Sequence, residues 1–370
     1  MTAVRFDSVA FKAEQRDTWN AVSAGWDFWQ DRYERAAAPV TEWLLRAAAL
    51  RPGHRVLDVG CGTGEPSVSA GRLVAPTGRV LGIDLAPEMV DRARRCAAGL
   101  GHPIEFAESD VEALDLPARS FDAVLSRWGL MFAVDRRRTL ASLHRLLAPG
   151  GVLAAAVWGP PEANPMTSLG FRTLAAGLPG PPPDRPGPFS MADAARTRAD
   201  LLAAGFTDVD VEPVGIAIRF SCVDEYLAYT RDVTPPGVLA AVRHQLGADA
   251  ERASWERLTE AAAVFADEHG VVTLPGSALC LRARRAPAPE TAAADTTATA
   301  ADTTATAADT TALDTAALAA DTTAPDTVGL APDTVGLATA GPATGVGPAA
   351  RRSATAGSGS PPTAAPGRAG

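Results

Sequence analysis

Three glycines in one short turn are the first residues of this sequence whose spacing suggests chemistry. Gly60, Gly62 and Gly64 follow the apolar segment VLDV at 56–59 and precede a segment that can start a helix. Such a turn brings the backbone very close to a ligand, because glycine has no side chain. A Walker-type triphosphate loop needs Lys followed by Ser or Thr after its last glycine. Glu and Pro stand there instead, so the sequence excludes that class of nucleotide triphosphatase.

The residue after the third glycine also argues against a dinucleotide. In a GxGxxG loop the third glycine would stand at position 65, which is Glu65 here. A carboxylate at the start of a helix would repel a pyrophosphate bound there. Pro66 suits the first turn of a helix. The turn therefore favours a ligand without phosphate.

Three carboxylates are expected near this turn, at the carboxyl ends of neighbouring strands. Asp58 lies inside the apolar segment, where a cationic partner such as an amino group would explain a buried carboxylate. Asp84 could accept hydrogen bonds from ribose hydroxyls or could cap the helix that starts near Pro87. Asp110 could accept a hydrogen bond from an adenine amino group or could be an ordinary loop residue. Together the three acids fit the amine, ribose and adenine of S-adenosylmethionine.

Alternating strands and helices must position these residues. Short, nearly continuous apolar segments alternate with helical segments up to position 157, which is typical of a parallel sheet covered on both faces. Right-handed connections then give a doubly wound α/β structure. The predicted strands are 55–59, 79–83, 104–108, 123–126 and 152–157, and the predicted helices are 8–25, 38–50, 65–74, 87–99 and 136–147.

The pattern changes after Trp158. The segments GPPEANP and GLPGPPPDRPGPF are rich in Pro and Gly and are predicted to be loops. A helix is expected over 193–204 and a strand over 209–220. Residues 221–269 look mainly helical, and VVTLPGSALCLRARR at 271–285 is predicted to be the last strand. A helical insertion between two late strands is a natural lid over a site at the strand ends.

The composition changes again after Arg285. Residues 286–370 are almost entirely Ala, Thr, Asp, Gly and Pro, and they repeat ADTTATA and PDTVGLA. Such a segment has too little apolar surface to offset the entropy of ordering, so we predict a disordered tail.

The acidic balance of the chain limits its partners. A net charge of -9 and a pI of about 5.2 argue against nucleic acid or an anionic membrane as a partner, because both attract a basic face. The four cysteines are far apart and indicate neither a zinc site nor a disulfide framework. The N-terminus lacks the apolar core of a secretory signal, so a cytoplasmic location is expected. The oligomeric state, monomer or homodimer, stays open.

Five motifs in order carry a family resemblance. The segments VLDVGCGTG, GIDLAPEMV, ESDVEALDLP, FDAVLSRWGLMF and LHRLLAPGGVL resemble the Rossmann-like S-adenosylmethionine-dependent methyltransferases. They are most similar to the bacterial small-molecule subgroup that includes the ubiquinone/menaquinone C-methyltransferases. The resemblance covers residues 10–285 and implies a doubly wound, mostly parallel seven-stranded sheet whose last strand is antiparallel. It divides the chain into an N-terminal helical cover at 1–50 and a methyltransferase domain at 51–285, with the lid at 221–269.

The resemblance also implies a cofactor site. The three glycines pass under the methionine and ribose moieties, and Asp58 helps to place the amino group. Asp84 binds the ribose hydroxyls, and Leu85 lies against the adenine. Asp110 and the backbone of Val111 read the adenine edge, and Ser126 faces the methionine. No metal ligands are expected, because no His, Asp or Glu cluster has metal spacing.

The acceptor side is less defined. Methyl transfer draws its reactivity from the cofactor, so the sequence predicts no catalytic residue. A flat or apolar acceptor would suit the residues after the fourth strand, although core packing is an equal alternative for their rings. Candidates in the presumed lid and near the LLAPGG motif are interpreted as packing or surface residues, and the aromatic N-terminal helices are expected to cover the cofactor. These candidates are Arg127, Trp128, Met131 and Phe132; His144, Tyr226, Tyr229 and His244; and Trp19, Trp26, Trp29 and Tyr33.

The predicted function is methyl transfer from S-adenosylmethionine to O or C of a hydrophobic small molecule, in secondary metabolism or quinone-like biosynthesis. One alternative keeps the cofactor but catalyses a cyclisation or rearrangement. A second is an NAD(P)-dependent oxidoreductase, which Glu65 and the GxGxG spacing disfavour. Methylation of protein or nucleic acid is disfavoured because SRWG stands where an NPPY-type motif would be expected.

Overall fold

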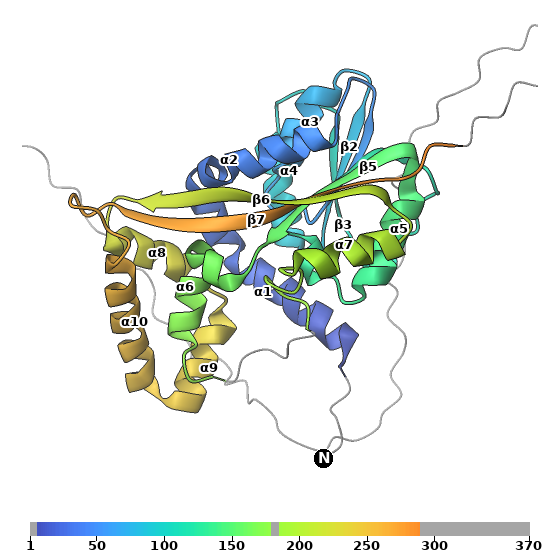
Figure 1. Cartoon of the computed structure of the whole chain (residues 1–370). Helices are drawn as coiled ribbons and strands as arrows, with labels where there is room; N and C mark the ends of the chain where they lie inside the picture. Colours follow the sequence, from blue (N-terminus) through green and yellow to red (C-terminus); the bar gives the residue numbers. More distant parts are fainter. Residues whose placement is uncertain (1–5, 179–184, 289–370) are drawn as a thin grey trace, which may run out of the picture. The chain divides into compact units, whose positions relative to one another are not determined.

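The computed structural model describes residues 6–178 and 185–288 (Figure 1). A single seven-stranded sheet has the strand order β3-β2-β1-β4-β5-β7-β6. Neighbouring strands run parallel except β7, which is antiparallel to both β5 and β6. The predicted fold class, including the antiparallel last strand, is confirmed. The strands are β1 (Arg55–Val59), β2 (Arg79–Asp84), β3 (Ile104–Glu108), β4 (Phe121–Arg127), β5 (Leu147–Trp158), β6 (Thr207–Phe220) and β7 (Val272–Arg284).

Helices connect the parallel strands. The chain moves outward from β1 to β2 and β3 through α3 (Ser67–Val74) and α4 (Pro87–Ala97), and in the opposite direction from β4 to β5 through α5 (Arg136–Leu146). Right-handed connections in opposite directions place helices on opposite faces of the sheet. The first βα turns and the loop after β4 therefore meet at the carboxyl ends of the strands, where ligands of such sheets bind.

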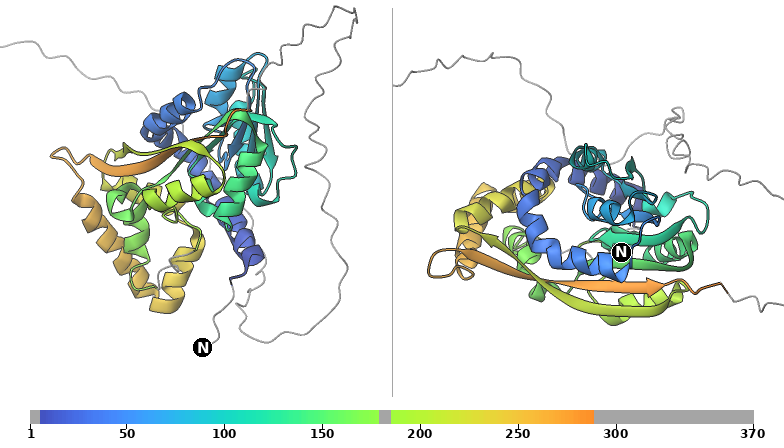
Figure 2. Two further views of the ribbon diagram at one scale, coloured as in Figure 1. Left: turned by 45° about the vertical axis from the view of Figure 1, so that its right-hand side comes forward. Right: turned by 90° about the horizontal axis from the view of Figure 1, so that it is seen from above.

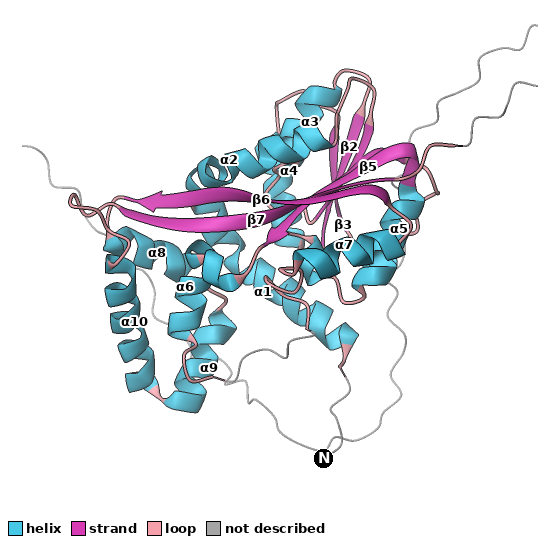
Figure 3. Ribbon diagram, viewed as in Figure 1, coloured by secondary structure: helices cyan, strands magenta, loops and turns pink. Residues whose placement is uncertain are grey.

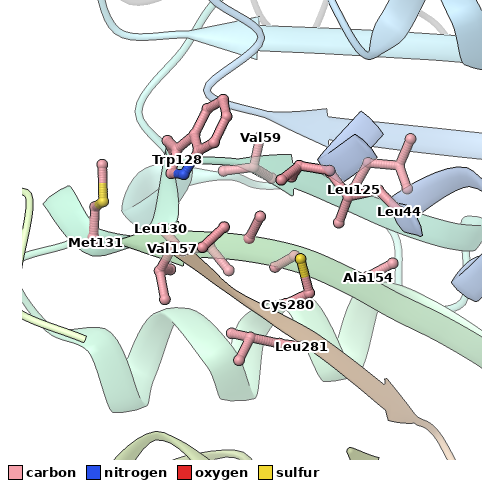
Figure 4. Close-up of a cluster of buried hydrophobic side chains, with 14 of the residues drawn as sticks. Leu44, Val59, Leu125, Trp128, Leu130, Met131, Ala154, Val157, Cys280 and Leu281 are labelled. Atoms are coloured by element: carbon pink, nitrogen blue, oxygen red, sulfur yellow. The ribbon is translucent and has the colours of Figure 1, made fainter. Parts of the chain in front are cut away.

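The sheet interior is the apolar core. Val56, Leu57 and Leu125 are fully buried, as expected for strands covered on both faces. Figure 4 shows part of this cluster, in which side chains from α2, β1, β4, β5 and β7 meet and the Trp128 indole lies near Val59.

Two N-terminal helices follow one another almost without a break, α1 (Ser8–Phe28) and α2 (Gln30–Ala47) (Figure 2). The sequence predicted helices over 8–25 and 38–50. The first prediction ends before the end of α1, and the second begins after the start of α2 and runs past its end. Pro39 lies inside α2 and removes one backbone donor there. Burial of one face of α2 outweighs that loss; its buried residues are Ala36, Ala37, Val40 and Leu44.

A group of helices lies on one side of the two long last strands, β6 and β7 (Figure 3). The predicted helical insertion after β6 consists of α8 (Val223–Val233), α9 (Pro236–Leu246) and α10 (Ala248–Ala263). It packs with α6 (Pro165–Leu174), a helix that the sequence analysis did not assign because the Pro- and Gly-rich segments on both sides of it dominated the pattern. Helix α7 (Ala194–Ala203), also predicted, leads into β6. The predicted disordered tail lies outside the described residues from position 289 onward.

Close packing of α1 on α8 depends on one glycine. A Cβ atom built on Gly25 would lie 2.1 Å from the carbonyl oxygen of Asp232, which is backbone and cannot move aside. The Trp29 indole N–H donates to the Asp232 carboxylate at 2.8 Å beside this contact. Gly25 therefore sets how closely the aromatic face of α1 approaches the rest of the fold.

We expect Gly25→Ala to lower the free energy of unfolding by about 1–3 kcal/mol, the usual cost of overpacking. Chemical denaturation measures the change. Gly237→Ala is the matched control, because nothing lies within 4 Å of a Cβ at Gly237. Equal stability of the two variants would show that α1 can shift without cost.

Candidate functional site

The end of β2 holds the glycine turn in place. The backbone N–H groups of Gly60 and Cys61 both donate to the Ile83 carbonyl, at 2.8 and 3.0 Å. Gly60 has a φ of 71°, and a Cβ atom there would lie 2.8 Å from the Cα of Gly129. Only glycine fits this position, because both the backbone angle and the space exclude a side chain. Gly62 has a φ of 51° and nothing within 4 Å of its would-be Cβ, so its surface is free for a ligand.

Asp84 is bound to the same turn. Its carboxylate accepts from the Gly62 N–H and from the Ala86 N–H, both at 3.0 Å. Helix α4 has no side-chain cap, so the alternative prediction, a helix cap at Asp84, is not how this carboxylate is used. Burial raises the pKa of Asp84, although the backbone donors oppose the shift.

Asp58 lies beneath the turn and is fully buried. One carboxylate oxygen accepts from the Ser67 hydroxyl at 2.5 Å, and the other has no partner among the described residues. Burial raises the pKa of Asp58 to about 7, against the opposing effects of the Ser67 hydrogen bond and the Arg127 charge. Asp58 is thus an unusual buried acid directly behind the glycines.

Asp110 is paired with a residue that sequence analysis did not single out. Its carboxylate accepts from Lys12 of α1 at 2.7 Å and from the Glu112 N–H at 2.9 Å. Lys12 also pairs with the Glu112 carboxylate at 2.7 Å. Burial favours neutral Lys12, but the hydrogen bonds to the two acids raise its pKa overall. The N-terminal part of α1 is therefore held at the carboxyl end of β3.

A cavity lies between the glycine turn, the loop after β4 and the N-terminal helices. Three of the predicted cofactor residues do not border it: Asp58 and Gly64 lie behind its wall, and the Ser126 hydroxyl donates to the Val59 carbonyl at 2.8 Å. The roles assigned to these three stay predictions. The other predicted residues all line the cavity: Gly60, Gly62, Asp84, Leu85, Asp110 and Val111.

Aromatic rings form a second wall. Four side chains on α1 and α2 occur at intervals of seven residues, so they share one face of these consecutive helices. All four line the cavity: Lys12, Trp19, Trp26 and Tyr33. The seven-residue spacing is present in the sequence. It places the four side chains in one cavity wall only because α1 and α2 follow one another almost without a break. Trp128 and Phe132, from the loop after β4, also line the cavity, whereas Trp29 points to Asp232. Trp128 also packs within the core, as one of the two interpretations expected, and its contact with an acceptor stays a prediction.

A buried arginine joins the two walls. The guanidinium of Arg127 binds both carboxylate oxygens of Glu34, at 2.5 and 2.6 Å, and donates to the Thr41 hydroxyl at 2.7 Å. Glu34 raises the pKa of Arg127 despite the burial. Glu65 lines the cavity beside them and accepts from the Ser69 N–H in the first turn of α3 at 3.2 Å. Burial, together with the Glu34 charge, raises the pKa of Glu65.

The remaining candidates lie elsewhere. Met131 is buried, and Tyr226 and Tyr229 are packed inside the fold, as the packing interpretation expected. Burial and the Arg285 charge lower the pKa of His144, which does not border the cavity. Among residues 6–178 and 185–288, no group of three metal-ligating side chains occurs. None of the helices in that part of the chain is long and apolar enough to cross a membrane.

Comparisons with known proteins match part of this chain. Residues 57–155 match the family model described as "Methyltransferase domain". An uncharacterized protein of Mycobacterium tuberculosis (strain H37Rv) is 39% identical over 127 residues, which are 34% of this chain and 45% of the relative. The ubiquinone/menaquinone biosynthesis C-methyltransferase of Pasteurella multocida is 28% identical over 170 residues, 44% of this chain and 63% of that protein. The structure of the YcgJ protein of Bacillus subtilis is 17% identical and aligns with 67% of this chain and 99% of its own, with a TM-score of 0.46.

The buried Asp58 carboxyl should make stability depend on pH. Because the folded state holds this proton up to about pH 7, against an ordinary value of 3.8, the free energy of unfolding should fall as pH rises between those values. Asp58→Asn cannot titrate and should remove part of that fall, on the order of a few kcal/mol. Urea denaturation at about pH 5, below the pKa of folded Asp58, and at about pH 8, above it, measures the difference.

Asp122→Asn is the control for this experiment. The pKa of Asp122 is lowered by its bonds to Arg55, although burial opposes this, so its stabilising contribution is lost only on further acidification. The Asp122→Asn variant should therefore show the same difference in unfolding free energy between the two pH values as the wild type. An Asp58→Asn protein with the full wild-type difference would show that Asp58 is ionised throughout.

Proposed function

Since the chain carries a methyltransferase domain of the Rossmann-like, S-adenosylmethionine-dependent class, we propose that it transfers a methyl group to O or C of a hydrophobic small molecule. The observation that carries the proposal is the composition of the cavity. Glycine backbone and carboxylates form one wall, and aromatic rings form the other. The first suits a nucleoside without phosphate, and the second suits an apolar acceptor. Secondary metabolism, quinone-like biosynthesis and a cytoplasmic location stay predictions.

The residues present fit S-adenosylmethionine. The open surface at Gly62 admits a ligand against the backbone, and Asp84 offers a carboxylate beside it. Leu85, Met89 and Val111 supply apolar surface for an adenine ring next to Asp110. In this proposal Gly60 and Gly62 lie under the cofactor, Asp84 accepts from the ribose and Asp110 stands at the adenine.

The cofactor supplies an electrophilic methyl group on a sulfonium centre. The chain's own residues bind, orient and exclude water. The Glu65 carboxylate, which makes no ion pair with a described residue, gives this part of the cavity a negative potential that suits a cationic ligand. No described residue is assigned as a general base.

Nicotinamide dinucleotides fit this cavity poorly. Their pyrophosphate would need the N-terminus of α3, where the Glu65 carboxylate already accepts from the Ser69 N–H. The pyrophosphate would be repelled there by the negative charge of Glu65.

Two measurements test the proposal together. Isothermal titration with S-adenosylmethionine and S-adenosylhomocysteine should show binding of both to the folded protein. Mass spectrometry of products from a panel of phenols, quinones and polyketides should show one methyl group in place of one hydrogen. A product of unchanged mass, formed only with cofactor, would instead establish a cyclisation or rearrangement. Absence of binding by either ligand would contradict the proposal.

Asp84→Ala should weaken S-adenosylhomocysteine binding by roughly 1–3 kcal/mol, because it removes a partly buried acceptor that also fixes the Gly62 backbone. Isothermal titration measures this loss. Asp91→Ala is a suitable control, since Asp91 is exposed on α4 and pairs only with Arg94. Unchanged affinity in the Asp84 variant would mean that this carboxylate does not contact the cofactor.

A further inference from the structure

The aromatic wall forms one connected row. Phe132 and Trp19 meet edge to face at 5.4 Å between ring centroids, and Trp19 contacts Trp26 at 6.4 Å. Tyr33 then meets Trp26 at 4.9 Å and Trp128 at 5.5 Å, both edge to face. Rings fixed in this way by their neighbours present a rigid apolar surface of limited thickness, which favours a flat ligand.

Trp128 anchors one end of the row. Its φ is 60°, a strained value for a bulky residue, and its backbone N–H donates to the Ala156 carbonyl at 2.7 Å. Its indole stacks on that of Trp158 with a centroid distance of 4.5 Å and an interplanar angle of 14°. The fold thus maintains a backbone strain that places this ring in the cavity wall.

The row offers hydrogen-bond donors without acceptors from Trp26 to Trp128. The buried indole N–H groups of Trp26 and Trp128 have no acceptor among the described residues. The Tyr33 hydroxyl makes no hydrogen bond to a described residue either. The two indole N–H groups are shielded from solvent, whereas Tyr33 is only partly buried and borders the cavity. Tyrosine hydroxyls in apolar surroundings normally have a partner. Because Tyr33 borders the cavity, its hydroxyl can donate to an acceptor atom of a ligand bound there.

The charges nearby select against anions. Arg127 is already bound by both oxygens of Glu34. Glu65 makes no ion pair with any described residue, so this part of the cavity keeps an excess negative charge. A carboxylate or phosphate on the acceptor would find no free cation here, while a neutral oxygen would meet the Tyr33 hydroxyl.

We propose that the acceptor is a planar, neutral ring system bearing a carbonyl or ether oxygen, and that the Tyr33 hydroxyl donates a hydrogen bond to that oxygen. This inference rests on the proposed function and narrows its acceptor class. Burial and the neighbouring Tyr229 raise the pKa of Tyr33 well above its ordinary value. Tyr33 is consequently a hydrogen-bond donor at neutral pH and not a base.

The test compares small ligands of matched size by ligand-observed NMR titration, with the protein saturated by S-adenosylhomocysteine. Chromone carries a ring carbonyl, naphthalene has the same flat shape without oxygen, naphthoate is an anion, and a naphthylmethyl-trimethylammonium salt is a cation. Chromone should bind more tightly than the other three. Tighter binding of the anion or of the cation, or equal binding of chromone and naphthalene, would overturn the inference.

Tyr33→Phe removes only the hydroxyl and should lower chromone affinity by about two- to ten-fold, the range for one hydrogen bond, with naphthalene affinity unchanged. Tyr229→Phe is the matched control, because Tyr229 is a buried neighbour of Trp26 that does not border the cavity. It should change neither affinity. A Tyr33→Phe protein that binds chromone like the wild type would also overturn the inference.

The outcome is separable from the proposed function. If S-adenosylhomocysteine fails to bind, methyl transfer is contradicted, and the same titrations on the protein alone still decide the acceptor class. If S-adenosylhomocysteine binds and chromone does not, the cofactor assignment stands and the acceptor inference fails. Because the wild-type ligand series decides by itself, the result does not depend on the folding of either variant.

Discussion

The site depends on the hydrogen bonds that fix the glycine turn to the end of β2. The Ile83 carbonyl accepts two N–H groups of the turn, and the Asp84 carboxylate accepts a third. These bonds join the carboxyl ends of β1 and β2, so the ligand surface forms from backbone that cannot shift independently of the sheet. The close contact of Gly60 with Gly129 adds the loop after β4 to the same unit. Three strand ends are thus fixed before any ligand binds, which lowers the entropy cost of binding.

The N-terminal helices complete this surface by two kinds of contact. Gly25 and Trp29 fix the end of α1 against α8 through close packing and a hydrogen bond. Ion pairs fix the other end, where Lys12 binds Asp110 and Glu112 at the carboxyl side of β3. Partly exposed ion pairs contribute little to stability, so we interpret the packed end as the anchor and the charged end as a weaker contact. The aromatic row lies between them.

The site concentrates features that cost stability. Asp58 is a buried carboxyl with one unpaired oxygen, and Asp84 and Glu65 are partly buried acids with raised pKa values. Trp128 has a strained backbone. The rest of the sheet supports them through a continuous apolar core. Unpaired or partly buried acids and a strained backbone are thus concentrated at the carboxyl ends of the strands, as is usual at functional sites.

The sequence by itself determined the sheet and the glycine turn. Strands β1 and β3 were predicted to the residue, because their apolar segments end abruptly at glycine or charged residues. Asp84 and Asp110 could be assigned to one site, since parallel strands bring their carboxyl ends together. Local sequence could not predict helix α6 or the part of α2 that precedes Pro39. In both, packing of the buried face outweighs the proline and glycine signals. Only the tertiary structure decided which residues form the aromatic wall of the cavity. Seven-residue spacing like that from Lys12 to Tyr33 is common in helices. These side chains form a cavity wall because α1 and α2 pack at the strand ends, where Tyr33 contacts Trp128.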